Sequence, residues 1–167
     1  MKTIITGLIA ALLFLGCSTE NASTETVDAK LVIDQNLSDL KLNDQFEKEH
    51  SLENGTKKII FAFSKDVGHK CNDFFATKEA SYLSENGAIF IADVSGAPSL
   101  IRSMFILPGL EDFKHTILVI DDKTVSKSYK TEENSEKIVV VSLNNKIITD
   151  IKYLNTVEEL STNLQNN

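Results

Sequence analysis

The sequence predicts an α/β domain in which helices cover both faces of a central mixed sheet. Three largely apolar runs, over 59–63, 88–94 and 116–120, have the length and composition of strands that are buried on both faces. Segments with the helical spacing of apolar residues separate these runs, and a hairpin and a last helix follow them. This alternation of strands and helices is typical of a sheet that is covered on both sides.

The domain is expected to open with a polar hairpin and to place its first helix after the first core strand. Leu37 to Leu52 alternates loosely between apolar and polar residues, and it turns at Asn43-Asp44-Gln45. After the strand at 59–63, a helix is expected from Gly68 to Leu83, where Asn86-Gly87 stops it. One broad face of this helix carries the apolar residues Cys71, Phe74, Phe75, Ala80 and Leu83.

A second helix is expected between the strands at 88–94 and 116–120. It begins after Ser95-Gly96, and Pro108-Gly109 is expected to end it because proline interrupts helical hydrogen bonding. Its apolar residues are Leu100, Ile101, Met104 and Phe105.

The last part of the chain predicts a short helical turn at 125–129, a hairpin and a final helix. The hairpin strands run over 138–143 and 146–153, around the turn Asn144-Asn145. Thr156 opens the final helix with the Thr-x-x-Glu spacing of a capping box, and Val157, Leu160 and Leu164 form its apolar stripe. The predicted core includes Phe61, Phe63, Phe74, Phe75, Ile91, Leu118, Val140 and Leu160.

The first residues have the composition of an export signal. Lys2 supplies a positive end, and the apolar run from Ile4 to Leu15 is shorter than the ~20 residues of a membrane-spanning helix. The segment ending in Gly16-Cys17 resembles the lipobox of bacterial lipoproteins, in which a small residue precedes the cysteine that is acylated. Phe14 departs from that motif, which usually has leucine there. An ordinary signal peptide or an uncleaved anchor is the alternative.

The expected organisation is therefore a lipoprotein signal peptide over residues 1–16, a lipidated Cys17 with a flexible polar tether over 17–36, and one domain over 37–167. Of the 17 basic residues the signal contains only Lys2, so 16 basic and 24 acidic residues remain and the net charge is −8. Such a charge disfavours nucleic acid as a partner. The expected partners are a membrane, through the lipid on Cys17, and a protein of the cell envelope. We expect the chain to be exported and to face the periplasm or the exterior.

The order of elements from Leu37 to about Leu164 resembles the thioredoxin fold. The segment DLKLNDQFEKEHSL resembles the leading hairpin of the branch that peroxiredoxins share with membrane-anchored thiol–disulfide proteins. The segment ILVIDDKTVSKSYKTEENSEKIVVVSLNNKII resembles the later strand, short helix and closing hairpin of that branch. The resemblance implies a three-layer sandwich with an active loop after the first core strand.

The resemblance also implies that the catalytic centre has been lost. Thioredoxins carry Cys-x-x-Cys in that loop, at a helix N-terminus, and the motif falls here on Gly68-His69-Lys70-Cys71. The attacking cysteine is thus glycine, and dithiol exchange needs both thiols. A peroxidatic cysteine would fall on Gly68 as well. The cis-proline of the fold is missing too, since residues 133–137 contain no proline.

Two functions remain open for the domain. One is a tethered binding or interaction module without dithiol catalysis, which we favour. The other is a one-cysteine thiol oxidoreductase or redox sensor that uses Cys71, because His69, Lys70 and a nearby helix start favour a thiolate. If Cys71 instead begins the apolar stripe, it is a small buried residue. Solvent access to its thiol separates the two.

Three further residue groups are weaker candidates. Ser95, Gly96 and Ser99 follow the end of a strand, where ligands bind in open α/β sheets, although Ser95 could simply cap the next helix, with Pro98 in its first turn. His69, Cys71 and His115 lack the paired spacing of metal ligands, so no metal is expected, and no cofactor either. His50 is expected to be solvated in the hairpin.

Overall fold

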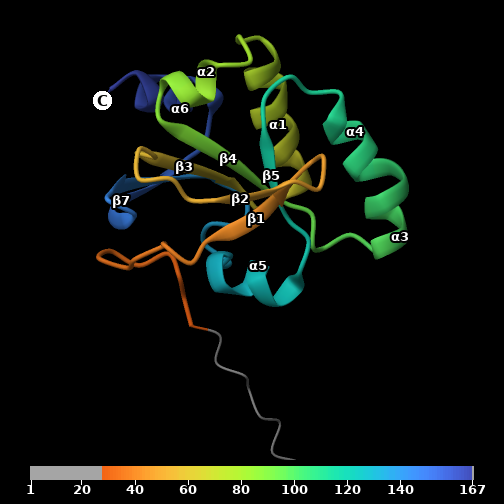
Figure 1. Ribbon diagram of the computed structural model, residues 1–167, viewed down its shortest axis with the longest axis horizontal. Helices are drawn as coiled ribbons and strands as arrows, with labels where there is room; N and C mark the ends of the chain where they lie inside the picture. The colour runs from red at the N-terminus through yellow and green to blue at the C-terminus, as the bar shows by residue number, and fades with distance from the viewer. Residues whose placement is uncertain (1–27, 167) are drawn as a thin grey trace, which may run out of the picture.

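The computed structural model describes residues 28–166, and these build a seven-stranded mixed sheet with helices on both faces (Figure 1). The strand order is β2-β1-β5-β4-β3-β6-β7. In its middle, β3 (Lys58–Ala62), β4 (Ala88–Asp93) and β5 (Ile117–Ile120) run parallel, because each connection between them passes through helices. The predicted α/β class and its three core strands are confirmed. The expected signal peptide and Cys17 lie outside the described residues.

The two predicted hairpins are confirmed, and they form the two edges of the sheet. The leading hairpin pairs β1 (Lys41–Asp44) with β2 (Glu49–Ser51), and the closing hairpin pairs β6 (Ile138–Asn144) with β7 (Ile147–Leu154). Asn145 and Lys146 have φ angles of 49° and 68°, so the closing turn lies one residue later than expected. Two consecutive left-handed residues are the backbone requirement of the tight turn that matches the twist of a hairpin.

The sheet separates two apolar cores. Helices α1 (Lys65–Ala76) and α6 (Val157–Gln165) cover one core, and α5 (Lys123–Tyr129) with the segment around Leu37 and Leu40 covers the other. The predicted capping box at Thr156 starts α6. Of the eight predicted core residues, only Phe74 is half-buried instead of buried.

The predicted helix from Gly68 to Leu83 has the wrong bounds. Helix α1 already begins at Lys65, because the side chain of Ser64 accepts a hydrogen bond from the N–H of Val67 and caps the helix. It ends at Thr77, whose N–H and hydroxyl both bond to the carbonyl of Phe74. A separate short helix, α2 (Tyr82–Glu85), follows and carries Leu83. The N-terminal shift matters for function because it places Gly68 one turn inside the helix.

The predicted end of the second helix at Pro108-Gly109 is also wrong. Three segments form one continuous helical rod: α3 (Ser99–Ile101), the π-helical turn η1 (Arg102–Ile106) and α4 (Leu107–Glu111). Within the rod the N–H of Leu107 bonds to the carbonyl of Arg102, five residues earlier. A wider π turn just before Pro108 accommodates a residue without an N–H, so the proline does not stop the helix.

The N-terminal end of the described chain already lies against the domain. The N–H of Lys30 bonds to the carbonyl of Ser128, and the N–H of Asp34 bonds to the carbonyl of Ile148. The domain side of the tether expected over residues 17–36 is therefore held from about Lys30, not from residue 37. Between residues 28 and 166, no helix is both long and apolar enough to cross a membrane.

Candidate ligand groove between α1 and the α3–η1–α4 rod

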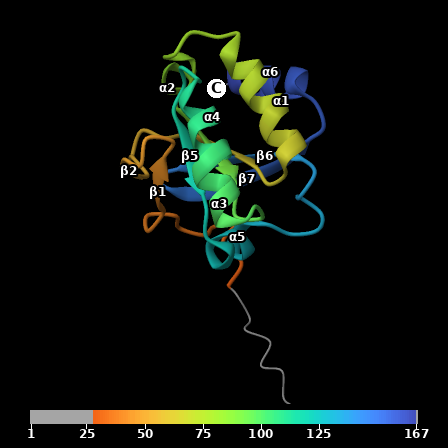
Figure 2. The ribbon, with the colours of Figure 1, turned by 90° about the vertical axis from the view of Figure 1, so that its right-hand side faces the viewer.

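A groove of about 860 Å³ opens at the carboxyl ends of β3 and β4. Its floor comes from Ala62 and Phe63 at the end of β3 and from Asp93 and Val94 at the end of β4. Helix α1 forms one wall and the α3–η1–α4 rod forms the other, and the two walls lie side by side in Figures 1 and 2. This edge of the sheet is where open α/β folds bind ligands.

The wall from α1 is polar. Its lining residues are spaced three and four apart, so they occupy one face of the helix. Lys65 and His69 are exposed at the N-terminal end of this face, and Asp73 is exposed two turns further along. This wall contributes Lys65, Gly68, His69, Asn72 and Asp73.

The wall from the rod is apolar and contains the π-helical turn. Phe105 is 64% exposed and Ile101 is 41% exposed, although both are large apolar side chains. An apolar surface left open inside a concave site is a feature of binding sites, and π-helical turns often occur at functional sites. This wall and the loop after it contribute Ile101, Phe105, Ile106, Gly109, Leu110 and Phe113.

Three glycines line the groove: Gly68, Gly96 and Gly109. None has a left-handed φ, and a Cβ added at any of them would meet no atom within 4 Å. Neither backbone conformation nor packing therefore requires glycine at these positions. Inside a helix, as for Gly68 and Gly109, glycine costs about 0.5–1 kcal/mol relative to alanine. The missing side chains widen the groove.

Cys71 lies on the opposite face of α1 and does not reach the groove. Its side chain is fully buried in the core beside Val67 and Phe75. Burial raises the pKa of the Cys71 thiol to about 12, and the charge of nearby Lys70 opposes this only weakly. The expectation of a helix-start position for the thiol motif is wrong, because the N–H of Gly68 donates to the carbonyl of Ser64 within the helix.

Comparisons with solved structures place this architecture among thioredoxin-like proteins. An uncharacterized thioredoxin-like protein from Porphyromonas gingivalis is 16% identical, with a TM-score of 0.50 over 80% of this chain and 92% of its own. Reduced Prx3 from Vibrio vulnificus is 14% identical, with a TM-score of 0.51 over 81% and 99%. Peroxiredoxin Q from Xanthomonas campestris is 11% identical, with a TM-score of 0.51 over 77% and 89%. This chain has a thioredoxin-like fold. No protein-family model and no curated protein matches its sequence.

The loop before β6 faces the start of α1, where the thioredoxin fold would hold its cis-proline. Glu136 in this loop accepts a hydrogen bond from the hydroxyl of Ser64 at 2.9 Å. The ammonium of Lys130, at the start of the loop, donates to the carbonyl of Phe63 at 2.7 Å. Residues 28–166 contain no cis peptide bond. Ser64, which caps α1, thus occupies the start of the helix and is held there by Glu136.

His115 is a core residue. Its side chain is buried among Phe75, Phe90 and Phe113, and its Nε2 donates to Asn72 Oδ1 at 3.1 Å. Burial lowers the pKa of His115 to about 4, so the imidazole is neutral at pH 7. Its Nδ1 has no hydrogen-bond partner within the described part of the chain. Across residues 28–166, no three His, Cys, Asp or Glu side chains come together to hold a metal ion.

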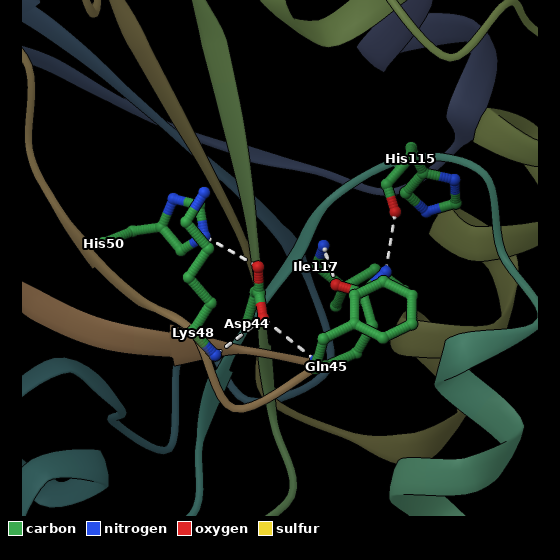
Figure 3. Close-up of polar contacts among 7 residues, drawn as sticks. Asp44, Gln45, Lys48, His50, His115 and Ile117 are labelled. Atoms are coloured by element: carbon green, nitrogen blue, oxygen red, sulfur yellow. Dashed lines mark hydrogen bonds and ion pairs between the residues drawn. The ribbon is translucent and has the colours of Figure 1, made fainter.

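His50 is paired and half-buried, which corrects the expectation that it is simply solvated. Its Nε2 lies 2.7 Å from Asp44 Oδ2, and Asp44 Oδ1 accepts hydrogen bonds from the N–H groups of Phe46 and Lys48 (Figure 3). Burial alone would raise the pKa of Asp44, but His50 and these N–H groups together lower it. The adjacent Gln45 side chain bonds to the carbonyl of His115 and the N–H of Ile117 (Figure 3). The network ties the leading hairpin to β5.

Only one of the three loop candidates reaches the groove. Gly96 lines it, whereas Ser95 is buried with its N–H donating to Asp93 Oδ1, and Ser99 is exposed at the start of α3. Pro98, not Ser95, is the residue that precedes the helix. The apolar wall was missed as a site: helical spacing indicated that Ile101 and Phe105 share a face, but it could not indicate that this face stays open.

Proposed function

We propose that this chain is an exported lipoprotein, tethered through Cys17, whose thioredoxin-like domain binds a ligand in the groove and carries out no dithiol exchange. The observation that supports this best is the separation of thiol and groove on α1. Cys71 is fully buried, while Lys65, Gly68 and His69 face the open space at the carboxyl ends of β3 and β4. The solved relatives support the fold alone, so the activity is argued from the site.

The absence of dithiol chemistry follows from what such chemistry needs. A disulfide is attacked by an exposed thiolate, and the mixed disulfide is then resolved by a second thiol. The sequence has two cysteines, Cys17 and Cys71, and only Cys71 lies in the domain. The Cys71 thiol has a pKa of about 12 and no access to solvent. It can therefore serve neither as the attacking thiolate nor as the resolving thiol.

The lipobox-like segment supports the proposed tether, and the position at which the domain begins limits how far the tether would reach. Lys30 lies thirteen residues after Cys17, and among the described residues it is the first whose backbone bonds to the domain. Such a segment spans at most ~45 Å when extended, so a lipid on Cys17 would keep the groove close to a membrane surface. The module would face the periplasm or the exterior, among envelope proteins and lipids.

Lipidation is tested by metabolic labelling with a clickable fatty acid. Wild-type protein should carry the label, and Cys17→Ala should abolish it. Cys71→Ala is the matched control and should be labelled like wild type, because its thiol is buried. Equal labelling of Cys17→Ala and wild type would contradict the tether.

Catalysis is tested by reduction of insulin disulfides and by consumption of peroxide. We expect no turnover above the uncatalysed rate from wild type, and no difference between wild type and Cys71→Ser. Turnover that disappears in Cys71→Ser would instead establish the one-cysteine oxidoreductase. That function requires α1 to open and expose a thiol that is sealed in the folded domain.

A further inference from the structure

The ligand of the groove can be assigned to a chemical class from the two walls. We infer that the groove binds a long-chain carboxylate, with its hydrocarbon chain along the α3–η1–α4 rod and its carboxylate at Lys65 and His69. This inference rests on the proposed function, since it names the ligand of the same groove. Three observations carry it: the hydrocarbon surface of one wall, the absence of a free strand edge in the floor, and the charge order along α1.

The rod wall offers hydrocarbon without hydrogen-bonding groups. Its side chains are Ile101, Phe105, Ile106, Leu110 and Phe113, and none of these side chains carries a hydrogen-bonding group. A polypeptide lying against this wall would bring unpaired backbone groups into an apolar site, whereas an alkyl chain has none to satisfy. The wall therefore favours an alkyl chain.

The floor gives an extended peptide nothing to pair with. Strand β3 is bonded to β4 and β6, and β4 is bonded to β3 and β5. Peptides that add to a sheet need an exposed strand edge, and the strands that end at this groove are central. This observation also favours a ligand without a backbone.

The charge order along α1 orients the ligand. The ammonium of Lys65 and the imidazole of His69 lie at one end of the polar wall. The carboxylate of Asp73 lies eight residues from Lys65, or ~12 Å along the helix axis. A ligand carboxylate is attracted to the Lys65 end and repelled from the Asp73 end. Because Asn72 bonds to His115, Phe113 lies near the Asp73 end, and the chain runs from Ile101 toward Phe113.

The glycines provide the space for the chain. Gly109 lies within the apolar wall, Gly96 lies in the loop before it, and Gly68 lies on the opposite wall. A Cβ at each position would project into open space, so a larger side chain there would fill the groove without disturbing its walls. This gives a way to close the site and leave the fold intact.

The test is displacement of the fluorescent polyene cis-parinaric acid from the mature chain carrying Cys17→Ser, which removes the acyl group but keeps the tether and the domain. Palmitate should displace the probe, and octanoate should bind at least a hundredfold more weakly, because each buried methylene adds roughly fourfold in affinity.

Gly109→Leu should weaken palmitate binding at least tenfold, while the midpoint of unfolding in urea stays at or above that of the parent. The control Ser103→Leu adds the same side chain to the same rod at an exposed position outside the groove, and should bind like the parent.

The carboxylate is tested with Lys65→Gln. This variant should weaken palmitate about fivefold to tenfold and leave 1-hexadecanol unchanged. Lys70→Gln removes a lysine from the same helix outside the groove and should change neither ligand. Equal effects of Lys65→Gln on the acid and the alcohol would overturn the assigned orientation.

Several outcomes would overturn the ligand class. One is a Gly109→Leu variant that binds palmitate like the parent. Another is binding to phosphatidylglycerol vesicles without binding of free palmitate, which would assign the groove to bilayer lipid. A third is a concentration-dependent dimer that Gly109→Leu abolishes, which would assign it to a second copy of the chain. In each case, absence of insulin or peroxide turnover in the same preparation leaves the non-catalytic module standing, so the two failures are distinguishable.

Discussion

The two faces of helix α1 have opposite properties, although they belong to twelve consecutive residues. The inner face carries Val67, Cys71 and Phe75, which are buried in the core. Phe75 packs against Phe90 and His115 there, with ring centroids 5.3 and 5.4 Å away. The groove face carries Lys65, Gly68 and His69, where side chains are exposed or missing.

This contrast teaches that position in a motif does not determine what a residue can do. Gly68 and Cys71 would be the two ends of a Cys-x-x-Cys motif, yet one lines the groove and the other is sealed in the core. The thiol contributes to packing, and the open face holds groups suited to binding. The helix start that would activate a thiol is capped by Ser64.

The largest expected difference concerns thiol reactivity. In a Cys17→Ser background, native Cys71 should react with the disulfide reagent DTNB at pH 8 at least a thousandfold more slowly than an ordinary thiol, because its pKa rises from 9.0 to about 12. Gly68→Cys, made in a protein without the other cysteines, places a thiol on the groove face. This thiol should react with DTNB at the rate of an ordinary exposed thiol. Absorbance of the released thiolate measures both. If Cys71 and the cysteine at position 68 react with DTNB at similar rates in the folded proteins, the inner face of α1 opens readily.

The next largest difference concerns stability. Truncating an aromatic side chain on the inner face of α1 should lower the free energy of unfolding far more than truncating one in the groove. Phe75→Ala should lower the free energy of unfolding by ~3–5 kcal/mol, because Phe75 is 2% exposed and a cavity would remain. Phe105→Ala on the opposite groove wall should cost less than ~1 kcal/mol, since Phe105 is 64% exposed. Urea unfolding followed by circular dichroism gives both values. Equal losses would mean that the apolar wall belongs to the core.

Acid should destabilise the core next to α1 through His115. The pKa of His115 is about 4 in the folded protein, whereas a histidine in the unfolded chain has its ordinary pKa of 6.5. The unfolded chain therefore binds the proton more readily. This contribution to stability is fully present above pH 6.5 and is lost as the pH falls toward 4, by roughly 3 kcal/mol in total. His115→Gln should remove that part of the pH dependence, while His69→Gln on the exposed face should leave it intact. Urea unfolding at pH 7, 5 and 4 compares the three proteins.

Most of the fold could be predicted from the sequence because its signals are local. The three apolar runs became the parallel strands, and the Thr156 capping box became the start of α6. What failed were helix ends. The cap at Ser64 is followed by no acidic partner at the usual spacing, and Pro108 is tolerated only because a π turn precedes it.

The candidate site could be predicted only in part, because burial is decided by tertiary packing. The sequence located the segment after the first core strand, whose Gly68 and His69 line the groove from inside α1. It left open whether Cys71 is exposed, since a helical stripe predicts a shared face but not what covers it. The apolar wall could not be recognised either, because Ile101 and Phe105 have the spacing of core residues. Their exposure depends on where the rod lies relative to α1.

The smallest expected effect is also the one that bears most directly on why the groove is open. Gly68→Ala should raise the free energy of unfolding by about 0.5–1 kcal/mol, because alanine favours the helix and its Cβ meets no atom within 4 Å.

Gly87→Ala is the matched control and should instead cost about 1 kcal/mol. Gly87 has a left-handed φ of 58°, and its Cβ would lie 3.3 Å from Lys57 Cγ. If the free energy of unfolding rises in Gly68→Ala and falls in Gly87→Ala, the backbone needs glycine at position 87 but the fold does not need it at position 68. A loss at Gly68 would reveal a hidden packing requirement on the groove face and remove the argument that its bare positions serve to keep the groove wide. Thermal and urea unfolding of the two alanine variants decide between these explanations.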